Sequence, residues 1–472
     1  MEKKPGLGKS TFWYSVGNIF SRSVGIVLLP FYSNFINTED FGVYSLLMAI
    51  YAFASVFYQS SLQNSLLKFY SEADQPDMKR IIFSSTLNVI AVLGIFLTAA
   101  GIIFSAQFSD LVLGSKIHSR LVSIVFIILL IDNISFFYLQ LLKTEERSGY
   151  ASGLVIISSI LNLILNILFV FIMRRGIEGI LIAQLISGAV LVLIIVKPLF
   201  KLYLPVIDKQ ILSNSVRFAF PLVVAGLLTS AVDFIDRFII DAFLGREEVG
   251  IYSFSYRIAL VMNLFVISLR SAWIPYVLRV SGNPESPLLL GKSFTKILSV
   301  CALIFLAVTL FTEDIFNLRI EGFDFINPEY KPGMDIIPLI LISYTFSSLL
   351  TFYSAAPFIT GKSYDFLYAD LTGFLLNIIF NFILIPQIGI TGAAAATLIS
   401  YAGSAFHMYL ISAKVIRIRY QTGKILFLIG LTTAIYLLTG FYKSLVTDVI
   451  LFLTALVFIY RSAELNYKTL FG

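Results

Sequence analysis

Charged residues that stand inside long apolar stretches are the residues of this sequence best suited to binding chemistry. They are the arginines Arg22, Arg237 and Arg257 and the carboxylates Asp132, Asp233, Asp236 and Asp370. A charge at the centre of a bilayer costs at least about 2.5–3.5 kcal/mol on insertion scales, so it persists where it meets a partner, water or a ligand. Arginine presents a fork of donors that matches phosphate oxygens, and a carboxylate can take up a proton or a cation. These residue types indicate sites for phosphate, protons or small cations.

Arg22 belongs to a polar stripe in the first apolar stretch. The stripe has spacings of three and four, which place its members on one helical face: Thr11, Ser15, Asn18, Arg22 and Gly25. One interpretation is that this face lines a cavity, where Arg22 and Asn18 bind a phosphate-bearing substrate. The alternative is that Arg22 is a structural anchor paired with Asp132. A lone carboxylate such as Asp132, at the centre of its stretch, either pairs with an arginine or is protonated for part of a cycle.

Two further charged groups lie in the seventh and eighth apolar stretches. Asp233, Asp236 and Arg237 share one helical face, and the acid-first order favours a pair between Asp233 and Arg237. Either the three charges neutralise one another and the trio only closes the outer gate, or one carboxylate is left to bind a proton or Na⁺. Arg257 lies about two turns from the outer end of its helix, where it either faces a cavity or extends outward to water. Arg237 and Arg257 are therefore also candidates for substrate binding, and Asp132 is a further candidate.

A cluster of oxygen-bearing side chains is predicted in the eleventh and twelfth stretches. Asp370, Asn377 and Asn381 share a face, and Thr397 follows in the next helix. Oxygen ligands from neighbouring helices suit a hard cation, so a Na⁺ site is one interpretation. Ordinary hydrogen bonds between helices are the alternative. We expect no cofactor beyond a coupling ion, H⁺ or Na⁺.

Enzyme chemistry has little support in this sequence. The single cysteine excludes a disulfide framework or a cysteine metal site, and two histidines form no cluster. No phosphate-binding glycine loop or nucleophile elbow is present. We therefore expect a protein that is not an enzyme.

Membrane helices are the elements that must position these residues. The 472 residues are 58% hydrophobic and 13% charged, with a mean hydropathy of +0.89, whereas an average soluble domain is about 25% charged. Fourteen stretches approach the length needed to span a bilayer, and the first has no cleavage signal after it. They lie near residues 12–36, 42–67, 81–105, 120–142, 151–173, 177–197, 215–241, 249–273, 293–312, 334–355, 361–385, 388–413, 423–441 and 445–461. The prediction is an all-α polytopic membrane protein with about fourteen transmembrane helices.

The basic residues set the orientation of these helices. With the N-terminus inside, 23 of the 34 lysines and arginines fall in inner loops and 8 in outer loops. Cytoplasmic loops are enriched in Lys and Arg, so both termini are predicted to be cytoplasmic. Membrane topology explains the net charge of +6 better than a nucleic-acid partner does.

An internal repeat divides the chain. Residues 35–45 match residues 243–253 at five of eleven positions, and residues 176–187 match 389–400 at seven of twelve. The pair Asn162/Asn166 recurs as Asn377/Asn381. Helices 1–6 and 7–12 are therefore two parallel copies of one unit, and repeat-built transporters bind cargo at the repeat interface. We predict an N-lobe at residues 1–200, a C-lobe at 201–415, and two further helices with a C-terminal tail at 416–472.

Two features of the sequence resemble a known family. The halves-of-six design and the run Asp236-Arg237-x-Ile239, then Gly245-x-x-x-Val249-Gly250-x-Tyr252-Ser253, resemble bacterial polysaccharide (O-antigen and capsule, Wzx-type) flippases. These belong to the MATE-like MOP superfamily, which includes lipid II flippases and MATE drug antiporters. The resemblance implies a V-shaped pair of bundles, a cationic central cavity and an undecaprenyl-diphosphate-linked oligosaccharide as cargo.

Site residues and partners follow from the same resemblance. Arg22 and Arg257 match cavity arginines of helices 1 and 8, and some relatives bind Na⁺ between helices 7, 11 and 12. The nearest matches to that ion site are Asp233 or Asp236 with Asn377, Asn381 and Thr397; Asn381 stands where an acid is expected. The implied setting is the bacterial cytoplasmic membrane, with membrane lipid and the polyprenyl-diphosphate-linked glycan as partners. Polysaccharide polymerase and chain-length proteins of the same pathway are further expected partners.

The expected activity is translocation of the lipid-linked glycan to the outer leaflet by alternating access, coupled to an ion or to the membrane potential. The alternatives are a lipid II flippase and a MATE-like cation-coupled drug antiporter. Three arginines within the membrane argue against a cavity for cationic drugs. A membrane glycan polymerase or ligase is a further alternative, but the loop at residues 313–333 is short for such an enzyme.

Overall fold

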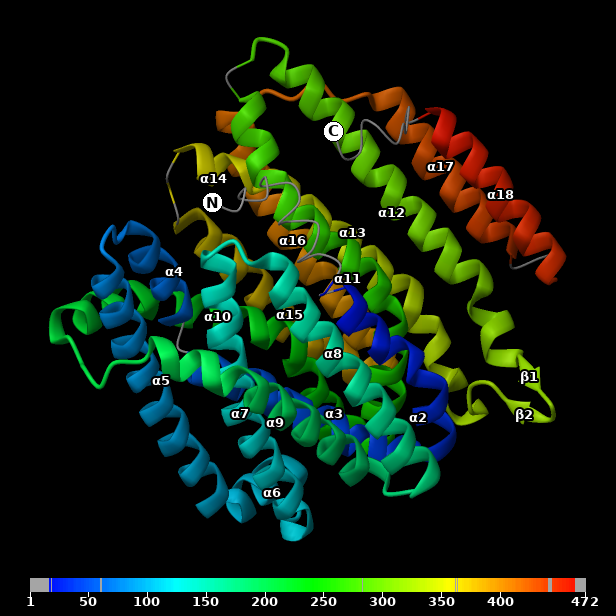
Figure 1. Ribbon diagram of the computed structural model, residues 1–472. Coiled ribbons are helices and arrows are strands. Elements are labelled where there is room, and N and C mark those ends of the chain that lie inside the picture. Colours follow the sequence, from blue (N-terminus) through cyan, green and yellow to red (C-terminus); the bar gives the residue numbers. More distant parts are fainter. Residues whose placement is uncertain are drawn as a thin grey trace. The chain divides into compact units, whose positions relative to one another are not determined.

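Helices make up nearly all of the structure. The computed structural model describes residues 17, 19–59, 62–281, 283–360, 362, 364–439 and 444–462 (Figure 1). Two compact units divide the chain, Met1–Gly250 and Ile251–Gly472.

The first unit is a helical bundle. After a helical segment at residues 19–27, it contains α2 (Leu29–Phe35), α3 (Thr38–Gln59), α4 (Leu62–Glu72), α5 (Pro76–Ile103), α6 (Ser105–Leu113), η1 (Lys116–His118), α7 (Ser119–Thr144), α8 (Ser148–Asn166), η2 (Ile167–Ile172), α9 (Gly176–Leu202) and α10 (Lys209–Leu244). Its core joins α4, α5, α7, α8 and α9 and includes the stacked rings of Phe83 and Phe137, whose centroids are 5.2 Å apart. α7 is the central helix, because α3, α4, α5, α6, α8 and α9 all pack against it.

Local sequence explains where these helices begin. The Asp208 carboxylate accepts hydrogen bonds from the backbone N–H groups of Gln210 and Ile211, both at 2.9 Å, and so caps α10. Pro76 opens α5 at a position where a helix needs no N–H donor. α8 continues into η2, a π-helical turn that starts directly after Asn166. Such turns widen the helix locally and are frequent near functional sites.

Two glycines of the internal repeat meet inside the first unit. A Cβ at Gly42, in the first turns of α3, would overlap the backbone carbonyl of Arg246, and a Cβ at Gly250 would overlap that of Thr38. Gly42 and Gly250 are equivalent repeat positions, and so are Thr38 and Arg246. The contact is therefore reciprocal, and only glycine lets the two backbones approach so closely.

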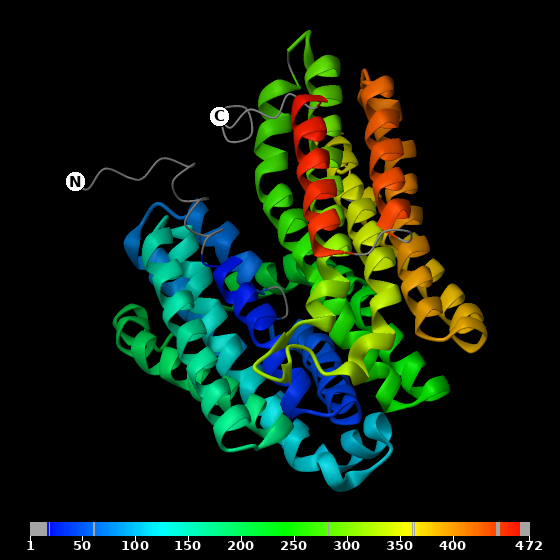
Figure 2. The same ribbon diagram turned by 90° about the vertical axis from the view of Figure 1, so that its right-hand side faces the viewer.

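The second unit is also helical, and α11 (Arg246–Val280) crosses the division between the units. It continues with α12 (Ser286–Asn317), β1 (Arg319–Ile320), β2 (Phe323–Asp324), η3 (Pro328–Ile336), α13 (Ile337–Tyr353), α14 (Ala355–Thr360), α15 (Tyr364–Ile388), α16 (Ile390–Val415), α17 (Thr422–Thr439) and α18 (Leu445–Ser462). α15 and α16 form an antiparallel hairpin, and α13 packs on α16. α17 and α18, orange and red in Figure 2, pack against α12.

A short hairpin replaces helix between α12 and η3. β1 and β2 are antiparallel, and Glu321 and Gly322 at its tip have φ angles of 51° and 88°. Two successive positive φ values are typical of the tight turn that matches strand twist. The acidic loop predicted at residues 313–333 is thus partly ordered by this hairpin and by η3.

The predicted fold class is confirmed. In the described residues, twelve helical stretches are long and apolar enough to cross a membrane, and each corresponds to one of the fourteen predicted spans. The two spans without such a match are the first and the last. The first runs partly outside the described residues, and the last is helical as α18. The count of fourteen is therefore approximate.

The predicted lobe boundaries, near residues 200 and 415, were drawn from the repeat and stay a prediction. The compact units follow a different criterion, packing. α10 packs on α3, α4 and α5, so it belongs to the first unit by its contacts.

Candidate ion and headgroup sites

Arg22 lies in the helical segment before α2 and is exposed. It forms no ion pair or hydrogen bond with another described residue. The described residues thus do not contain the predicted alternative, an anchor between Arg22 and Asp132. Asn18, the other member of the stripe assigned to substrate binding, lies outside the described residues.

Asp132 instead accepts hydrogen bonds from two neutral side chains of the first unit. The Tyr51 hydroxyl of α3 donates to Oδ2 at 2.8 Å, and Gln184 Nε2 of α9 donates to the same oxygen at 3.4 Å.

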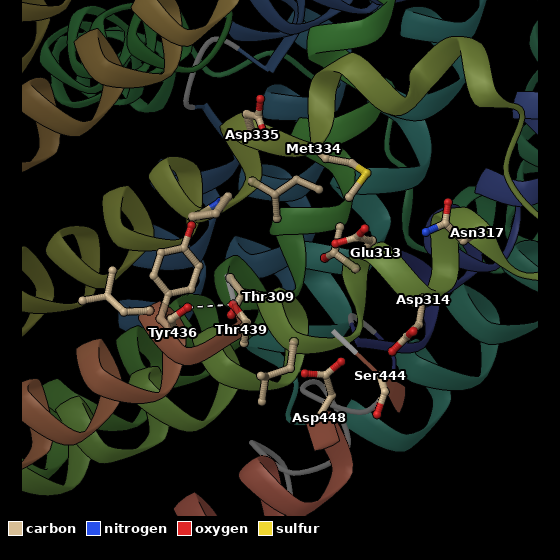
Figure 3. A pocket seen from close by; sticks show the side chains of 15 residues that line it. Thr309, Glu313, Asp314, Asn317, Met334, Asp335, Tyr436, Thr439, Ser444 and Asp448 are labelled. Atoms are coloured by element: carbon tan, nitrogen blue, oxygen red, sulfur yellow. Dashed lines mark hydrogen bonds between the residues drawn. The ribbon is translucent and has the colours of Figure 1, made fainter. Parts of the chain in front are cut away.

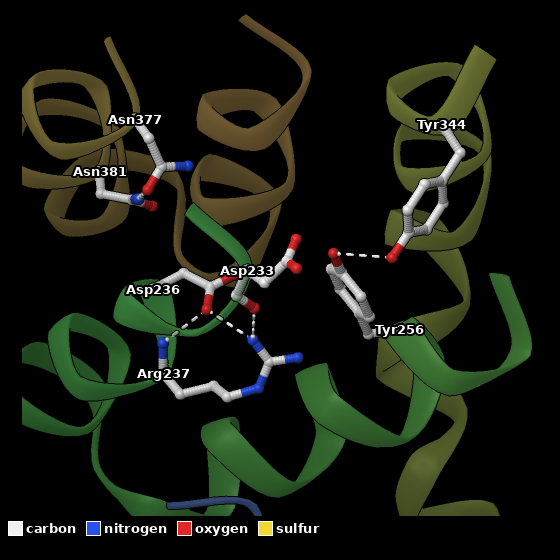
Figure 4. A network of polar contacts seen from close by, with 7 residues as sticks. All are labelled: Asp233, Asp236, Arg237, Tyr256, Tyr344, Asn377 and Asn381. Atoms are coloured by element: carbon white, nitrogen blue, oxygen red, sulfur yellow. Dashed lines mark hydrogen bonds and ion pairs between the residues drawn. The ribbon is translucent and has the colours of Figure 1, made fainter. Parts of the chain in front are cut away.

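Within the charged trio of α10, Arg237 forms an ion pair with its neighbour Asp236. Arg237 Nη1 lies 2.7 Å from Asp236 Oδ1, and the same nitrogen donates to the backbone carbonyl of Asp233 (Figure 4). Asp236 and Arg237 are 1% and 6% exposed. The guanidinium folds back along its own helix, so the spacing of four brings it to the backbone oxygen of Asp233.

Arg257 is half-buried in α11, one residue after a tyrosine that helps to join three helices of the second unit. Tyr344 of α13 donates its hydroxyl to Tyr256 at 3.1 Å (Figure 4), and the ring of Tyr344 packs on Tyr401 of α16. This contact fixes the α11 backbone next to Arg257.

The repeated asparagine pairs have the same geometry in both copies. In α8, Asn166 Nδ2 donates to Asn162 Oδ1 at 3.0 Å. In α15, Asn381 Nδ2 donates to Asn377 Oδ1 at 2.9 Å (Figure 4). The remaining amide atoms of the first pair are satisfied, because the Tyr32 hydroxyl donates to Asn166 Oδ1 and Asn162 Nδ2 donates to Ser187 Oγ.

The second copy leaves polar atoms without partners. Asn377 Nδ2, Asn381 Oδ1 and Thr397 Oγ1 are sealed from solvent and have no hydrogen bond among the described residues. The repeat explains part of the difference: Ser400, equivalent to Ser187, donates to the carbonyl of Gly373 instead. A buried polar group without a partner costs about 1–3 kcal/mol, so a ligand at this place would be stabilised.

Thr397 lies level with the asparagine pair. Gly373 of α15 contacts Ser400 and Ser404 of α16, and Gly392 contacts Leu384, so the antiparallel register places Thr397 beside Asn377. Three residues of the predicted ion-coupling set are therefore brought together in the second unit.

The other predicted ion ligands do not join them in this unit. Asp370 lies nearly two turns from Asn377 along α15, half-buried, and Arg270 is the charged group that acts on it. Asp233 and Asp236 belong to the first unit. His407 packs between helices, with Nδ1 2.7 Å from Thr372 Oγ1.

A cavity of about 620 Å³ opens at one end of the second unit (Figure 3). Carboxylates of α12, η3 and α18 line it, namely Glu313, Asp314, Asp335 and Asp448. None of the predicted site residues lines this cavity.

Comparison with known proteins decides the family. The sequence matches the family described as polysaccharide biosynthesis protein over residues 7–281. The chain belongs to this family. The probable low-salt glycan biosynthesis flippase Agl15 of Haloferax volcanii is 24% identical over 440 residues, which cover 89% of this chain and 86% of the relative.

Solved structures agree on the fold of this family member. It is similar to the lipid II flippase MurJ in an inward closed conformation, with a TM-score of 0.75 and 17% identity over 96% of this chain and 99% of that one. An inward-facing multidrug resistance MATE transporter of the MOP superfamily follows, with a TM-score of 0.70 and 15% identity over 83% and 94%. The predicted resemblance and the expectation of a transporter rather than an enzyme are confirmed.

Sequence reasoning missed the neutral partners that decide these sites. Tyr51, Gln184 and Tyr32 were not singled out, because tyrosine and glutamine in apolar stretches carry no charge to mark them. One signal was present for Gln184. Gln184 is equivalent to Thr397 in the repeated segment. Because Thr397 is a candidate ion ligand in the second copy, a polar contact was to be expected at Gln184 in the first copy.

Proposed function

We propose that the protein is a flippase that moves a lipid-linked oligosaccharide from the inner to the outer leaflet of the cytoplasmic membrane, with both of its own termini in the cytoplasm. The observation that carries the proposal is the family match over more than half of the chain. The relative Agl15, a probable glycan biosynthesis flippase, and the fold shared with lipid II flippase support it. Undecaprenyl diphosphate is the proposed carrier.

Arg22 and Arg257 are proposed to bind the diphosphate. An exposed arginine without a partner among the described residues, as Arg22 is, keeps all its donors for a ligand. Arg257 is proposed on the resemblance of its helix to the family pattern. Arg237 forms an ion pair with Asp236 and is therefore proposed to have mainly a structural role.

Na⁺ is proposed to bind at Asn377, Asn381 and Thr397. Asn381 Oδ1 and Thr397 Oγ1 are buried oxygens without partners among the described residues, and oxygen is the ligand that hard cations prefer. Such an ion would couple transport to a Na⁺ gradient. The asparagine pair in the first copy serves as an internal reference, because its amide atoms already have hydrogen-bond partners.

The test is flipping of a fluorescent undecaprenyl-diphosphate oligosaccharide by the full chain in liposomes, with and without a Na⁺ gradient. Arg22→Gln and Arg257→Gln each remove a charge-assisted contact worth about 1.5–3 kcal/mol, so each should slow flipping by roughly ten- to hundredfold. Arg279→Gln, an exposed arginine of α11, is the matched control and should flip at the wild-type rate.

Two results would argue against the proposal. Wild-type rates in both test variants would exclude headgroup binding by these arginines. Gradient-driven flux of a cationic dye without glycan flipping would favour the drug antiporter, whose fold the chain shares. The pathway polymerase and chain-length proteins stay predicted partners.

A further inference from the structure

Asp132 is among the predicted substrate-binding residues, but a carboxylate repels a diphosphate, so headgroup binding gives this membrane-embedded acid no role. It lies on α7, the central helix of the first unit. Tyr51 of α3 and Gln184 of α9 both donate to its Oδ2, at 2.8 and 3.4 Å. α9 also packs tightly here, since a Cβ at Gly188 would lie 3.4 Å from Asp132 Oδ1. The carboxyl group is thus held in one orientation by neutral neighbours.

No positive charge in the described part of the chain pairs with this acid. No lysine, arginine or histidine there forms an ion pair with Asp132. Tyr51 is the titratable group in contact with it, and no side chain of α4, α5, α6 or α8 adds a hydrogen bond or a charge. Two neutral donors stabilise a carboxylate but do not neutralise it. In an apolar bundle, the charge can then be removed by binding a proton or a small cation.

The two carboxyl oxygens have different surroundings. Oδ2 accepts both hydrogen bonds, whereas Oδ1 accepts none from the described residues. Oδ1 is also not among the sealed polar atoms of the structure, and Asp132 is only partly buried. A proton can therefore join Oδ1 and leave it again while both bonds to Oδ2 persist. Protonation therefore changes the charge of the carboxyl group while its hydrogen bonds to Tyr51 and Gln184 are kept.

The repeat supplies an independent observation. Gln184 is equivalent to Thr397, the residue beside the asparagine pair in the second copy. Both copies thus place a polar side chain at the same point of equivalent helices. In the second copy it lies level with neutral amides, and in the first copy it donates to a carboxylate. Neutral oxygens suit Na⁺, whereas a partly buried acid suits H⁺.

We propose that Asp132, held by Tyr51 and Gln184, is a proton-binding site that couples transport to a proton gradient. The proton comes from water on one side of the membrane and returns to water on the other, and no further reactant is consumed. A bound proton shifts the conformational equilibrium only if the conformations differ in proton affinity. This inference rests on the proposed function for its coupling role, but the proton site itself can be tested without cargo.

The first experiment measures the proton directly. Infrared difference spectra of the purified protein between low and high pH are recorded for the wild type and for Asp132→Asn. We expect one protonated-carboxyl band that is missing in Asp132→Asn and retained in Asp110→Asn, an exposed acid of α6 in the same unit. Tyr51→Phe, which removes one hydrogen bond and keeps the acid, should move the frequency of that band. Identical spectra for wild type and Asp132→Asn would overturn the proposal.

The second experiment measures coupling. Flipping of the fluorescent lipid-linked oligosaccharide is compared in liposomes with and without a pH gradient. The ratio of the two rates should fall to about one in Asp132→Asn and stay at the wild-type value in Asp110→Asn. An unchanged ratio in Asp132→Asn would overturn the coupling role. If the wild type flips no glycan at all, the proposed function fails, and the infrared band still decides whether Asp132 binds a proton.

Discussion

At the scale of single residues, the two asparagine pairs share the same internal hydrogen bond but differ in whether their other amide atoms have partners. Each pair is joined by one Nδ2 to Oδ1 bond, at 3.0 Å in α8 and 2.9 Å in α15. The two pairs differ in the partners of their remaining amide atoms. The Tyr32 hydroxyl donates to Asn166 Oδ1 and Asn162 donates to Ser187, whereas Ser400, the equivalent of Ser187, donates to the carbonyl of Gly373. The second pair therefore keeps Asn377 Nδ2 and Asn381 Oδ1 without partners among the described residues.

A change at this pair should strengthen Na⁺ binding. Asn381→Asp puts a charged oxygen beside Asn377 Nδ2 and Thr397 Oγ1, which lack partners among the described residues. Saturating Na⁺ should then raise the stability of the variant by roughly 1–3 kcal/mol more than that of the wild type. The measurement is thermal unfolding of the purified protein in NaCl and in KCl of equal concentration.

Asn166→Asp is the matched control for this prediction. Its new carboxylate keeps the Tyr32 hydroxyl as a donor, so its response to Na⁺ should equal that of the wild type. An equal gain in both variants would mean that any added charge, rather than the open site, causes the effect.

At the scale of elements, the reciprocal glycine contact fixes where α3 and α11 begin. Gly42 and Gly250 each face a backbone carbonyl of the other repeat copy, and neither carbonyl can move without disturbing its own helix. The repeat found in the sequence is thus also a structural contact, in which equivalent residues of the two copies touch each other.

Alanine at these glycines should destabilise the protein. Gly42→Ala and Gly250→Ala each force two backbones apart, at a cost of about 1–3 kcal/mol for overpacking. Gly153→Ala in α8, where a Cβ meets nothing within 4 Å, should be neutral or stabilising, because alanine favours helix by about 0.8–1.0 kcal/mol over glycine. Thermal unfolding of the three variants provides the comparison. Equal stability of Gly42→Ala and Gly153→Ala would rule out the tight contact.

At the scale of the whole molecule, the distribution of positive charge predicts the orientation of the chain in the membrane. Lysine and arginine gather in the loops predicted to be cytoplasmic, and the hairpin between β1 and β2 lies in a loop predicted to be outside. Cys301 is buried, 1% exposed, and its Sγ lies 3.5 Å from Ser348 Oγ, so a serine hydroxyl at this position keeps a hydrogen-bond partner and a Cys301→Ser background should preserve the fold.

Cysteine labelling of cells tests this orientation. In the Cys301→Ser background, Glu321→Cys at the hairpin tip should react with a membrane-impermeant maleimide added outside. Glu285→Cys, in the turn before α12, should react only after the membrane is permeabilised. Both residues are exposed, so access is not limited by packing. The reverse pattern would place the termini outside.

The sequence by itself determined the class, most helices and the repeat. Apolar stretches of membrane-spanning length carry that information locally, which is why twelve of the fourteen predicted spans reappear. It also singled out the charged residues and the pair Asn377/Asn381, because polar groups in apolar stretches are conspicuous.

Only the tertiary structure decided what those residues contact. It paired Arg237 with its neighbour Asp236, placed Tyr51 and Gln184 on Asp132, and left Arg22 without a partner among the described residues. The physical reason is that spacing along a helix fixes a face but not the neighbour on that face. Tyr51 and Gln184 stand 81 and 52 positions from Asp132 in the chain, so only the packing of α3, α7 and α9 could bring them together.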